Sequence, residues 1–284
     1  MEQKYILENA TSFEPVHVFE CGQCFRWDKE SDGSYTGIFG NNVMNVKKEN
    51  NNIIFSGICE GDIKEVCTEY FDLTTNYEDI KNRISKIDEY LANSIKYGNG
   101  IRILHQDLWE ALISFIISAN NNIPRIKGII ERISKKYGNK IRFRDKEYYT
   151  FPTPEELSKA SVQDFRDLGL GFRDVRVYET TQKVLTNEVN LKYLEDEKNV
   201  NTLREELLKV PGVGPKVADC VMLFALKKFE VFPIDVWVKR VISELYFKGE
   251  EQKPKVIEEF AKKNYGNLAG LAQQYLFYWR RDTA

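Results

Sequence analysis

The feature that most constrains this chain is a short segment in which two prolines and two glycines separate two apolar stretches. It lies in residues 207–220, Leu-Leu-Lys-Val-Pro-Gly-Val-Gly-Pro-Lys-Val-Ala-Asp-Cys. Pro211 ends a preceding helix, and Pro215 suits the first position of a new helix, where the N–H has no partner to lose. Gly212 and Gly214 allow positive φ and leave the backbone bare. The segment therefore predicts a helix, a tight turn and a second helix whose free amides face outward and suit a phosphate.

Lys216 lies in the first turn of the second predicted helix. A cation there opposes the helix dipole, so helix stability alone does not explain it. The dipole also favours the neutral amine, which is the nucleophilic form. The alternative is a lysine that contacts a phosphate or is simply solvated. From the turn alone, a DNA-binding module and an enzyme are about equally supported.

Composition limits the possible functions. The chain has 284 residues, of which 42% are hydrophobic and 13% aromatic, so it can build one large domain or two modest ones and is not disordered. A net charge of −2 and a pI near 5.9 argue against a protein that coats nucleic acid non-specifically. An enzyme acting at one place needs only a local basic face, so this charge weakens the binding-module hypothesis more than the enzyme hypothesis.

Cysteine and histidine usage argues against a metal centre. The cysteines are odd in number and scattered, which favours reduced thiols: Cys21, Cys24, Cys59, Cys67 and Cys220. The C-x-x-C pair at 21–24 has no second pair, and His17 and His105 lie in no zinc motif. The longest apolar run, residues 111–119, is too short to cross a bilayer. We therefore expect a soluble, cytoplasmic protein with no metal and no cofactor.

Residues 12–58 contain short apolar and β-branched runs separated by turn formers, which predicts an antiparallel meander. The runs are residues 16–19, 24–27, 35–39, 43–46 and 53–55. Two helices, 62–71 and 77–97, should follow, because apolar residues recur there at helical spacing. A Gly-Asn-Gly turn at 98–100 closes this unit. We expect residues 1–100 to be a sheet domain with two helices.

The remainder of the chain has the pattern of helices that each carry a start signal. The predicted N-caps are Asp107, Thr153, Asn201 and Asp235. Asp107 precedes a helix over residues 108–119, and Asp235 precedes one over residues 236–246. The predicted class is α+β, with the antiparallel sheet domain packed on a larger helical domain at residues 101–284.

The same segments resemble one family. Residues 210–220, followed by Pro-Ile-Asp at 233–235, resemble the helix-hairpin-helix, Gly/Pro-rich loop and aspartate motif of base-excision DNA glycosylases. Lys216, with Cys220 four residues later, resembles the 8-oxoguanine DNA glycosylase/AP lyase branch. Five motifs in the expected order extend the resemblance from the sheet domain to Phe277, and they imply the same two-part architecture.

The resemblance implies that Lys216 is the catalytic nucleophile and that Asp235 faces it across the active site. Excision passes through an oxocarbenium-like sugar, whose charge a fixed carboxylate stabilises. Helix capping alone also explains Asp235, and Asp219, one turn from the lysine, could pair with it. In the family, the residues of the turn contact the DNA backbone, which here are Gly212, Val213 and Gly214.

Four residues match the family's pocket for the damaged base: Gly22, Cys220, Gln273 and Phe277. The Gly22 carbonyl would accept the N7 hydrogen that 8-oxoguanine has and guanine lacks. Cys220 would form the floor, Phe277 the opposite side, and Gln273 would read the base edge. From the residues alone, Gly22 is a strand glycine at a bulge, Cys220 is a buried hydrophobe or a thiolate that pairs with Lys216, and Phe277 is core.

Two loops match those that the family inserts into the duplex. Asn120 would fill the gap left by the flipped base, and Phe172 would be a wedge beside the opposite base. Arg125 and Arg173 would read the estranged cytosine. Without the resemblance, the three asparagines at 120–122 are a helix end followed by a cap.

We therefore expect an enzyme that removes 8-oxoguanine from duplex DNA, preferably opposite cytosine, and cleaves the abasic strand by β-elimination through a lysine Schiff base. The alternatives are a non-catalytic hairpin module and a glycosylase for another damaged base. We expect a monomer that binds no membrane and is located in the nucleoid of a prokaryote or the nucleus of a eukaryote.

Two departures from the family qualify the resemblance. Trp237 stands where better-known members have a histidine near the DNA backbone, and Phe172 replaces a tyrosine. The four-cysteine cluster of the iron-sulfur relatives is absent, which argues against the adenine and thymine-glycol branches.

Overall fold

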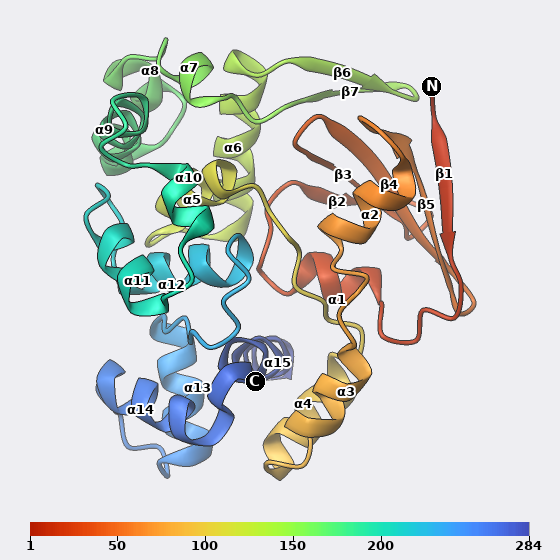
Figure 1. Ribbon diagram of the computed structural model, residues 1–284, viewed down its shortest axis with the longest axis vertical. Helices are drawn as coiled ribbons and strands as arrows, with labels where there is room; N and C mark the ends of the chain where they lie inside the picture. Colours follow the sequence, from red (N-terminus) through yellow and green to blue (C-terminus); the bar gives the residue numbers. More distant parts are fainter. Residues whose placement is uncertain (284) are drawn as a thin grey trace.

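Five strands form one antiparallel sheet in the N-terminal part of the computed structural model, which describes residues 1–283 (Figure 1). Their spatial order is β1-β5-β4-β3-β2. The strands are β1 (Gln3–Leu7), β2 (Trp27–Lys29), β3 (Tyr35–Phe39), β4 (Asn42–Glu49) and β5 (Asn52–Ile58). Gly37 of β3 pairs with Trp27, and a Cβ at Gly37 would lie 2.3 Å from the indole Cδ2. Glycine therefore lets the Trp27 ring cover the sheet.

The predicted meander is confirmed from β3 to β5, but its beginning is wrong. Residues 16–19 belong to a helix, α1 (Pro15–Glu20), which starts with proline at its first position and buries Pro15, Val18 and Phe19. These three buried positions have helical spacing, which a run of four apolar residues does not reveal. The expected strand at 24–27 begins only at Trp27, and β1 lies before the predicted meander.

Helices α2 (Ile63–Tyr70), α3 (Tyr77–Ile84) and α4 (Glu89–Tyr97) follow the sheet. The first matches its prediction, with Asp62 as the N-cap. The single helix predicted over residues 77–97 is wrong, because the chain breaks after Ile84 and restarts at Asp88. The Asp88 side chain accepts a hydrogen bond of 2.9 Å from the Leu91 amide and so caps α4.

The larger part is helical, as predicted, and the α+β class is confirmed. Its elements are α5 (Leu108–Ser118), α6 (Ile123–Tyr137), α7 (Pro154–Leu157), α8 (Val162–Asp167), η1 (Gly171–Arg173), α9 (Asp174–Leu185), α10 (Leu191–Asp196), α11 (Val200–Leu208), α12 (Pro215–Phe224), α13 (Val236–Tyr246), α14 (Pro254–Tyr265), η2 (Gly266–Leu268) and α15 (Ala269–Thr283). Within it, the structure adds a hairpin that the sequence reasoning missed, β6 (Lys140–Phe143) and β7 (Lys146–Tyr149), which reaches toward the sheet (Figure 1).

The predicted helix starts are confirmed at Asp107, Thr153 and Asp235, whose side chains all cap the following helix. Thr153 also forms a capping box with Glu156. The predicted cap at Asn201 is wrong, because Asn199 caps α11 and accepts hydrogen bonds from the amides of residues 201 and 202.

The helical part shares its core with the segment before β2 and with α3 and α4, and the sheet has a second cluster of its own. Helix α5 is buried on nearly all sides, and its cluster of apolar side chains includes Cys21 and Phe25 from the segment before β2. Buried residues of α3 and α4 belong to the same cluster, and α15 packs against α4. The segment 21–25 is thereby fixed between the sheet and the helices. None of the helices within residues 1–283 is both long and apolar enough to cross a membrane.

Candidate active site

The helix-hairpin-helix predicted from the two prolines is formed by α11, a turn and α12. Gly212 has a φ of 84°, and a Cβ there would lie 2.9 Å from Arg176 Cδ, so the turn requires glycine. Gly214 differs from the prediction, because its φ of −99° is open to any residue. As N-cap of α12 it offers no side chain, and nothing lies within 4 Å of its Cβ position. The first amides of α12 therefore have no side-chain cap.

A cavity of about 410 Å³ lies between α5, α12, α13 and α15. It collects most of the residues that sequence reasoning assigned to catalysis and to the base pocket: Lys216, Asp235, Gly22, Cys220, Gln273, Phe277 and Asn120. We call it the lesion cavity, after the role that the sequence resemblance implies for these residues. Phe115 and Phe224, whose ring centroids are 5.5 Å apart, give it an apolar inner wall.

Lys216 and Asp235 enter this cavity from the first turn of α12 and from the N-cap of α13. Lys216 Nζ lies 5.5 Å from the centroid of the Phe115 ring and forms no ion pair within residues 1–283. Asp235 Oδ1 accepts a hydrogen bond of 2.7 Å from the Val238 amide. The capping role of Asp235 is thus real, and its second oxygen accepts no hydrogen bond from the described residues.

Asp219 does not pair with Lys216. Its carboxylate binds Arg204, with Nη2 at 2.8 Å and Nε at 3.0 Å, and neither residue lines the lesion cavity. Burial raises the pKa of Asp219 to about 6, and Arg204 limits that rise. This excludes the simplest alternative to a free Lys216.

Cys220 lies one turn beyond Lys216, as predicted, and is buried. Burial raises the pKa of its thiol to about 11, although the nearby Lys216 opposes the rise. A raised pKa of the Cys220 thiol disfavours the suggested thiolate–ammonium pair at neutral pH. Cys220 is a neutral, apolar part of the cavity wall.

Gly22 borders the lesion cavity with a φ of 86°. Its Cβ position is 3.4 Å from Phe277 Cε1, and its carbonyl accepts no hydrogen bond within residues 1–283. The neighbouring Gln23 holds the segment in place, because its side chain donates to the carbonyls of Val18 and Arg102 and accepts from the Leu104 amide. Sequence reasoning missed Gln23, although a glutamine within an apolar stretch could have drawn attention to it.

Gln273 and Phe277 enter the cavity from α15. Gln273 is buried, and its Oε1 accepts only a hydrogen bond of 3.3 Å from Gln274 Nε2. The Gln273 amide is thus free to bind a polar ligand. Trp237 also lines the cavity, and its buried Nε1 has no hydrogen-bond partner.

The two predicted insertion loops lie beside the cavity mouth and bind each other. Phe172 is 59% exposed, whereas Arg173 next to it is 2% exposed. Arg173 donates to the carbonyls of Ala119, Asn120 and Leu170. Arg125 is exposed and donates a hydrogen bond of 3.3 Å to the Gly169 carbonyl. Each arginine therefore holds the backbone of the opposite loop.

A second hollow adjoins the lesion cavity at Ala119 and joins these loops to the hairpin. It is lined by Phe172, Arg173 and the turn residues Gly212, Val213 and Gly214, among others. The sequence-predicted wedge, opposite-base and backbone residues thus form one continuous surface around the entrance, with the exposed Arg125 at its edge.

Two exposed apolar residues at this surface were not predicted. Ile123 is 40% exposed and Val236 78%, and both line the lesion cavity. Each is the first residue of its helix, directly after the caps Asn122 and Asp235. An apolar residue at the first position of a helix could have revealed them in the sequence, because side chains at that position point into solvent. Within residues 1–283, no group of three His, Cys, Asp or Glu side chains is placed to hold a metal ion.

Comparison with known families divides the chain into two matched regions. Residues 5–112 match the family described as "8-oxoguanine DNA glycosylase, N-terminal domain", and residues 113–266 match "HhH-GPD superfamily base excision DNA repair protein".

Similar proteins come from all three domains of life. The chain is 32% identical to the "Probable N-glycosylase/DNA lyase" of Methanothermobacter thermautotrophicus, over 78% of this chain and 76% of that protein. It is 33% identical to the "N-glycosylase/DNA lyase" of Saccharomyces cerevisiae, over 81% and 68%. A crystal structure of the 8-oxoguanine glycosylase/lyase of Clostridium acetobutylicum, bound to duplex DNA with cytosine opposite 8-oxoguanine, superposes with a TM-score of 0.94 at 42% identity, covering 100% of this chain and 98% of that one.

Proposed function

This chain belongs to the 8-oxoguanine DNA glycosylase/lyase family of the HhH-GPD superfamily, and we propose that Lys216 and Asp235 carry out its reaction. The protein is a bifunctional base-excision repair enzyme, which removes 8-oxoguanine and cleaves the abasic strand. The observation that supports the assignment of residues is their shared cavity, in which an amine and a carboxylate lie together with the four predicted base-pocket residues.

Lys216 is the nucleophile. Its neutral amine attacks C1′ as the bond from C1′ to the base breaks, and the base leaves with the bonding electrons and takes up a proton. The attached nitrogen then loses a proton, the bond between C1′ and O4′ breaks as O4′ takes up a proton, and the opened sugar is held as a protonated Schiff base. Loss of a proton from C2′ then breaks the bond between C3′ and the 3′ oxygen, which is β-elimination. The absence of an acidic partner for Lys216 within residues 1–283 supports this role, because an ion pair would hold the amine protonated.

Asp235 stabilises the positive charge that develops on the sugar. Its Oδ1 is held by the Val238 amide, which fixes the carboxylate at the cavity wall. A fixed carboxylate needs little reorganisation when charge develops at C1′. The hydrogen bond by which Asp235 caps α13 therefore also holds its carboxylate in the position needed for catalysis.

The damaged base is read by the Gly22 carbonyl, with Cys220 and Phe277 on its two faces and Gln273 at its edge. The lack of any hydrogen bond to the Gly22 carbonyl supports this role. An N–H at position 7 satisfies that acceptor, whereas the N7 lone pair of guanine leaves it unpaired, at a cost of about 1–3 kcal/mol. The neutral Cys220 thiol suits the face of an uncharged base.

The duplex is held on the surface around the entrance. Gly212, Val213 and Gly214 bind a backbone phosphate through the open amides of α12. Asn120 and Phe172 enter the helix stack, while Arg125 and Arg173 contact the opposite base. We also propose that the enzyme acts as a monomer on DNA, in whichever compartment holds the chromosome, and that the sheet region ends near residue 100 of the sequence.

Borohydride trapping tests the assignment of Lys216. Incubation with an 8-oxoguanine duplex should give a covalent protein–DNA adduct that Lys216→Gln abolishes. Lys209→Gln is a matched control, since Lys209 is an exposed lysine before the same turn that pairs with Glu206. An adduct formed by the Lys216 variant would place the nucleophile elsewhere.

Base excision by Asp235→Asn separates catalysis from capping. Asparagine is as good an N-cap as aspartate, so the variant should keep its stability and lose about 100-fold or more in excision rate. Asp62→Asn at the N-cap of α2 should change neither property. Loss of stability with an unchanged excision rate would reduce Asp235 to a cap.

A further inference from the structure

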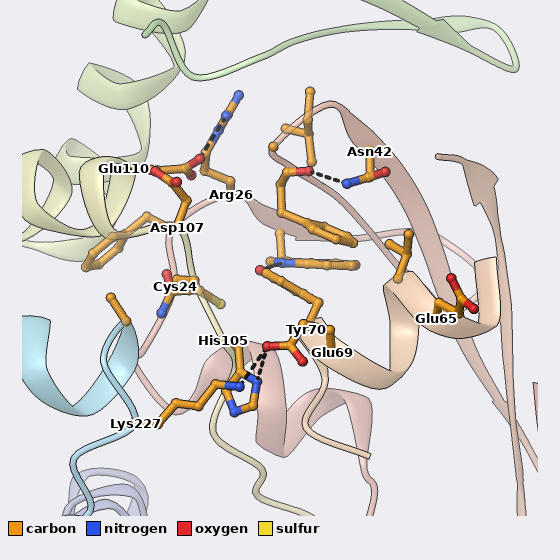
Figure 2. A pocket seen from close by; sticks show the side chains of 18 residues that line it. Cys24, Arg26, Asn42, Glu65, Glu69, Tyr70, His105, Asp107, Glu110 and Lys227 are labelled. Carbon is orange, nitrogen blue, oxygen red and sulfur yellow. Dashed lines mark hydrogen bonds and ion pairs between the residues drawn. The ribbon is translucent and has the colours of Figure 1, made fainter. Parts of the chain in front are cut away.

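A second cavity, of about 550 Å³, borders the segment that carries Gly22 (Figure 2). Gly22 lines the lesion cavity, whereas Cys24, Arg26 and Trp27 line the second cavity, and Phe25 lines both. A segment only six residues long, 22–27, therefore separates the two spaces. A volume of about 300–1,000 Å³ is typical of sites for small molecules.

One wall of the second cavity is a stack of aromatic rings. The centroids of Phe39 and Tyr70 are 3.7 Å apart with their planes 13° from parallel, and the Trp27 ring lies 6.1 Å from both. Ile38 and Val66 extend the same wall. Such a wall suits a flat apolar group.

The opposite wall carries a carboxylate without a hydrogen bond. Glu110, on α5, is 15% exposed, and its carboxylate accepts no hydrogen bond within residues 1–283. The nearest cationic atom, Arg26 Nη1, is 3.7 Å away and is itself buried without a hydrogen-bond partner. Arg26 Nη2 donates instead to the carbonyl of Tyr149. Figure 2 shows Glu110 and Arg26 together on one side, across from Tyr70.

This arrangement leaves room for an external donor. The ion pair of Glu110 with Arg26 Nη1, at 3.7 Å, is too long for a hydrogen bond, so the carboxylate can still accept one from a ligand. Because Arg26 Nη1 is inaccessible and Nη2 is already bound, the group that faces the space is the Glu110 carboxylate.

The charged side chains that line the second cavity are mostly acidic. The lining contains two cations, Arg26 and Lys227, and four carboxylates, Glu65, Glu69, Asp107 and Glu110. Lys227 is bound to Glu69 at 2.7 Å. Burial lowers the pKa of His105, so its ring adds no charge at neutral pH. Burial raises the pKa of Glu110 to about 7, so it carries only part of its charge at neutral pH, but the three other carboxylates still outnumber the two cations. This surplus of negative charge favours a positively charged ligand, which would also draw Glu110 into its charged form.

We propose that this cavity is a binding site for a small organic cation with a flat apolar body, of which an arylalkylamine is the simplest example. The ammonium donates hydrogen bonds to Glu110, and the ring lies against Trp27 and Tyr70. The ligand contacts the back of the segment that holds Gly22. This inference concerns a site separate from the proposed active site and does not depend on it.

Isothermal titration of the full chain with tryptamine tests the site. Tryptophol has a hydroxyl group in place of the ammonium, and methylammonium lacks the ring. Tryptamine should bind saturably, and each comparator should bind at least about tenfold more weakly.

Three variants locate the bound probe. Glu110→Gln should weaken tryptamine binding about tenfold or more. Glu65→Gln, at the exposed rim, and Asp235→Asn, in the lesion cavity, should leave the affinity within about twofold. Thermal unfolding of each variant verifies that it is folded.

The proposal is overturned by any of three results: no saturable binding of tryptamine, equal binding of tryptophol, or an affinity that Glu110→Gln leaves unchanged. Loss of binding in Asp235→Asn alone would place the probe in the lesion cavity and would equally overturn it.

Discussion

Arg173 Nη2 donates a hydrogen bond of 2.8 Å to the backbone carbonyl of Asn120, a residue with a φ of 50°. The arginine thereby fixes the loop that is proposed to fill the gap left by a flipped base. Its guanidinium also binds the Ala119 and Leu170 carbonyls, and it is buried. In the free protein, Arg173 is a structural link between the two insertion loops.

Removal of this link should destabilise the protein. Arg173→Ala leaves carbonyls without donors, so we expect the free energy of unfolding to fall by about 2–4 kcal/mol. Arg125 is exposed and makes one long hydrogen bond, so Arg125→Ala should cost no more than about 0.5 kcal/mol. Urea unfolding of both variants measures the difference. Equal stabilities would mean that the carbonyls find other partners.

Gly22 should be required for base recognition more than for strand cleavage. Alanine at a φ of 86° is strained by about 1–2 kcal/mol, and relief of that strain moves the carbonyl away from the base. We expect Gly22→Ala to lower the rate of 8-oxoguanine excision by about tenfold or more. Cleavage of a preformed abasic site should change little. Single-turnover assays on a duplex with 8-oxoguanine and on a duplex with an abasic site measure the two rates.

Gly33→Ala is the matched control for this substitution. Gly33 has a φ of 83° in the turn between β2 and β3, with nothing within 4 Å of its Cβ position. Alanine at position 33 would be under the same backbone strain as alanine at position 22, but at a place outside the lesion cavity. A similar loss of excision in both variants would mean that strain alone, and not the position of the Gly22 carbonyl, explains the effect.

Glu110 should make stability depend on pH. Burial raises the pKa of its carboxyl to about 7, with Arg26 opposing and Asp107 adding to the rise. The folded state then binds a proton more tightly than the unfolded state, so stability falls as pH rises from about 4.5 to 7. Glu110→Gln removes this cost and should stabilise the protein by about 1–3 kcal/mol at pH 8, with little effect at pH 5.

Thermal unfolding of wild type and Glu110→Gln across this range measures the effect. If the variant is instead less stable than wild type at pH 8, the ion pair with Arg26 outweighs the cost of burial.

The sequence predicted those parts of the fold that depend on local chemistry. Asp107, Thr153 and Asp235 cap their helices as expected, because a short polar side chain before an apolar periodic run has few other uses. The run at residues 16–19 failed because four apolar residues fit a strand as well as one helical turn. The β6–β7 hairpin was missed because its Arg144–Asp145 turn lacks glycine, although Arg144 adopts a φ of 52°.

The candidate site was predictable in its membership but not in its contacts. Lys216, Asp235 and the four base-pocket residues line one cavity, as the resemblance implied. The partner of Asp219 was not predictable, since Arg204 is brought to it by the packing of α11 on α12. The burial of Arg173 likewise depends on where two distant loops meet, which no local pattern specifies.

The last prediction concerns the base opposite the lesion. Two guanidiniums can donate to the O2 and N3 acceptors of cytosine, which thymine matches in part and adenine does not. Arg125 is the readily available donor, because it is exposed and only weakly bound to Gly169, whereas Arg173 has to release a backbone carbonyl first. We expect wild type to prefer cytosine by about 1–3 kcal/mol for each good contact. Excision measured opposite each of the four bases should show Arg125→Ala losing most of this preference with its stability intact, and Arg173→Ala losing both. Equal wild-type rates on all four pairs would mean that the arginines serve only to hold the loops together.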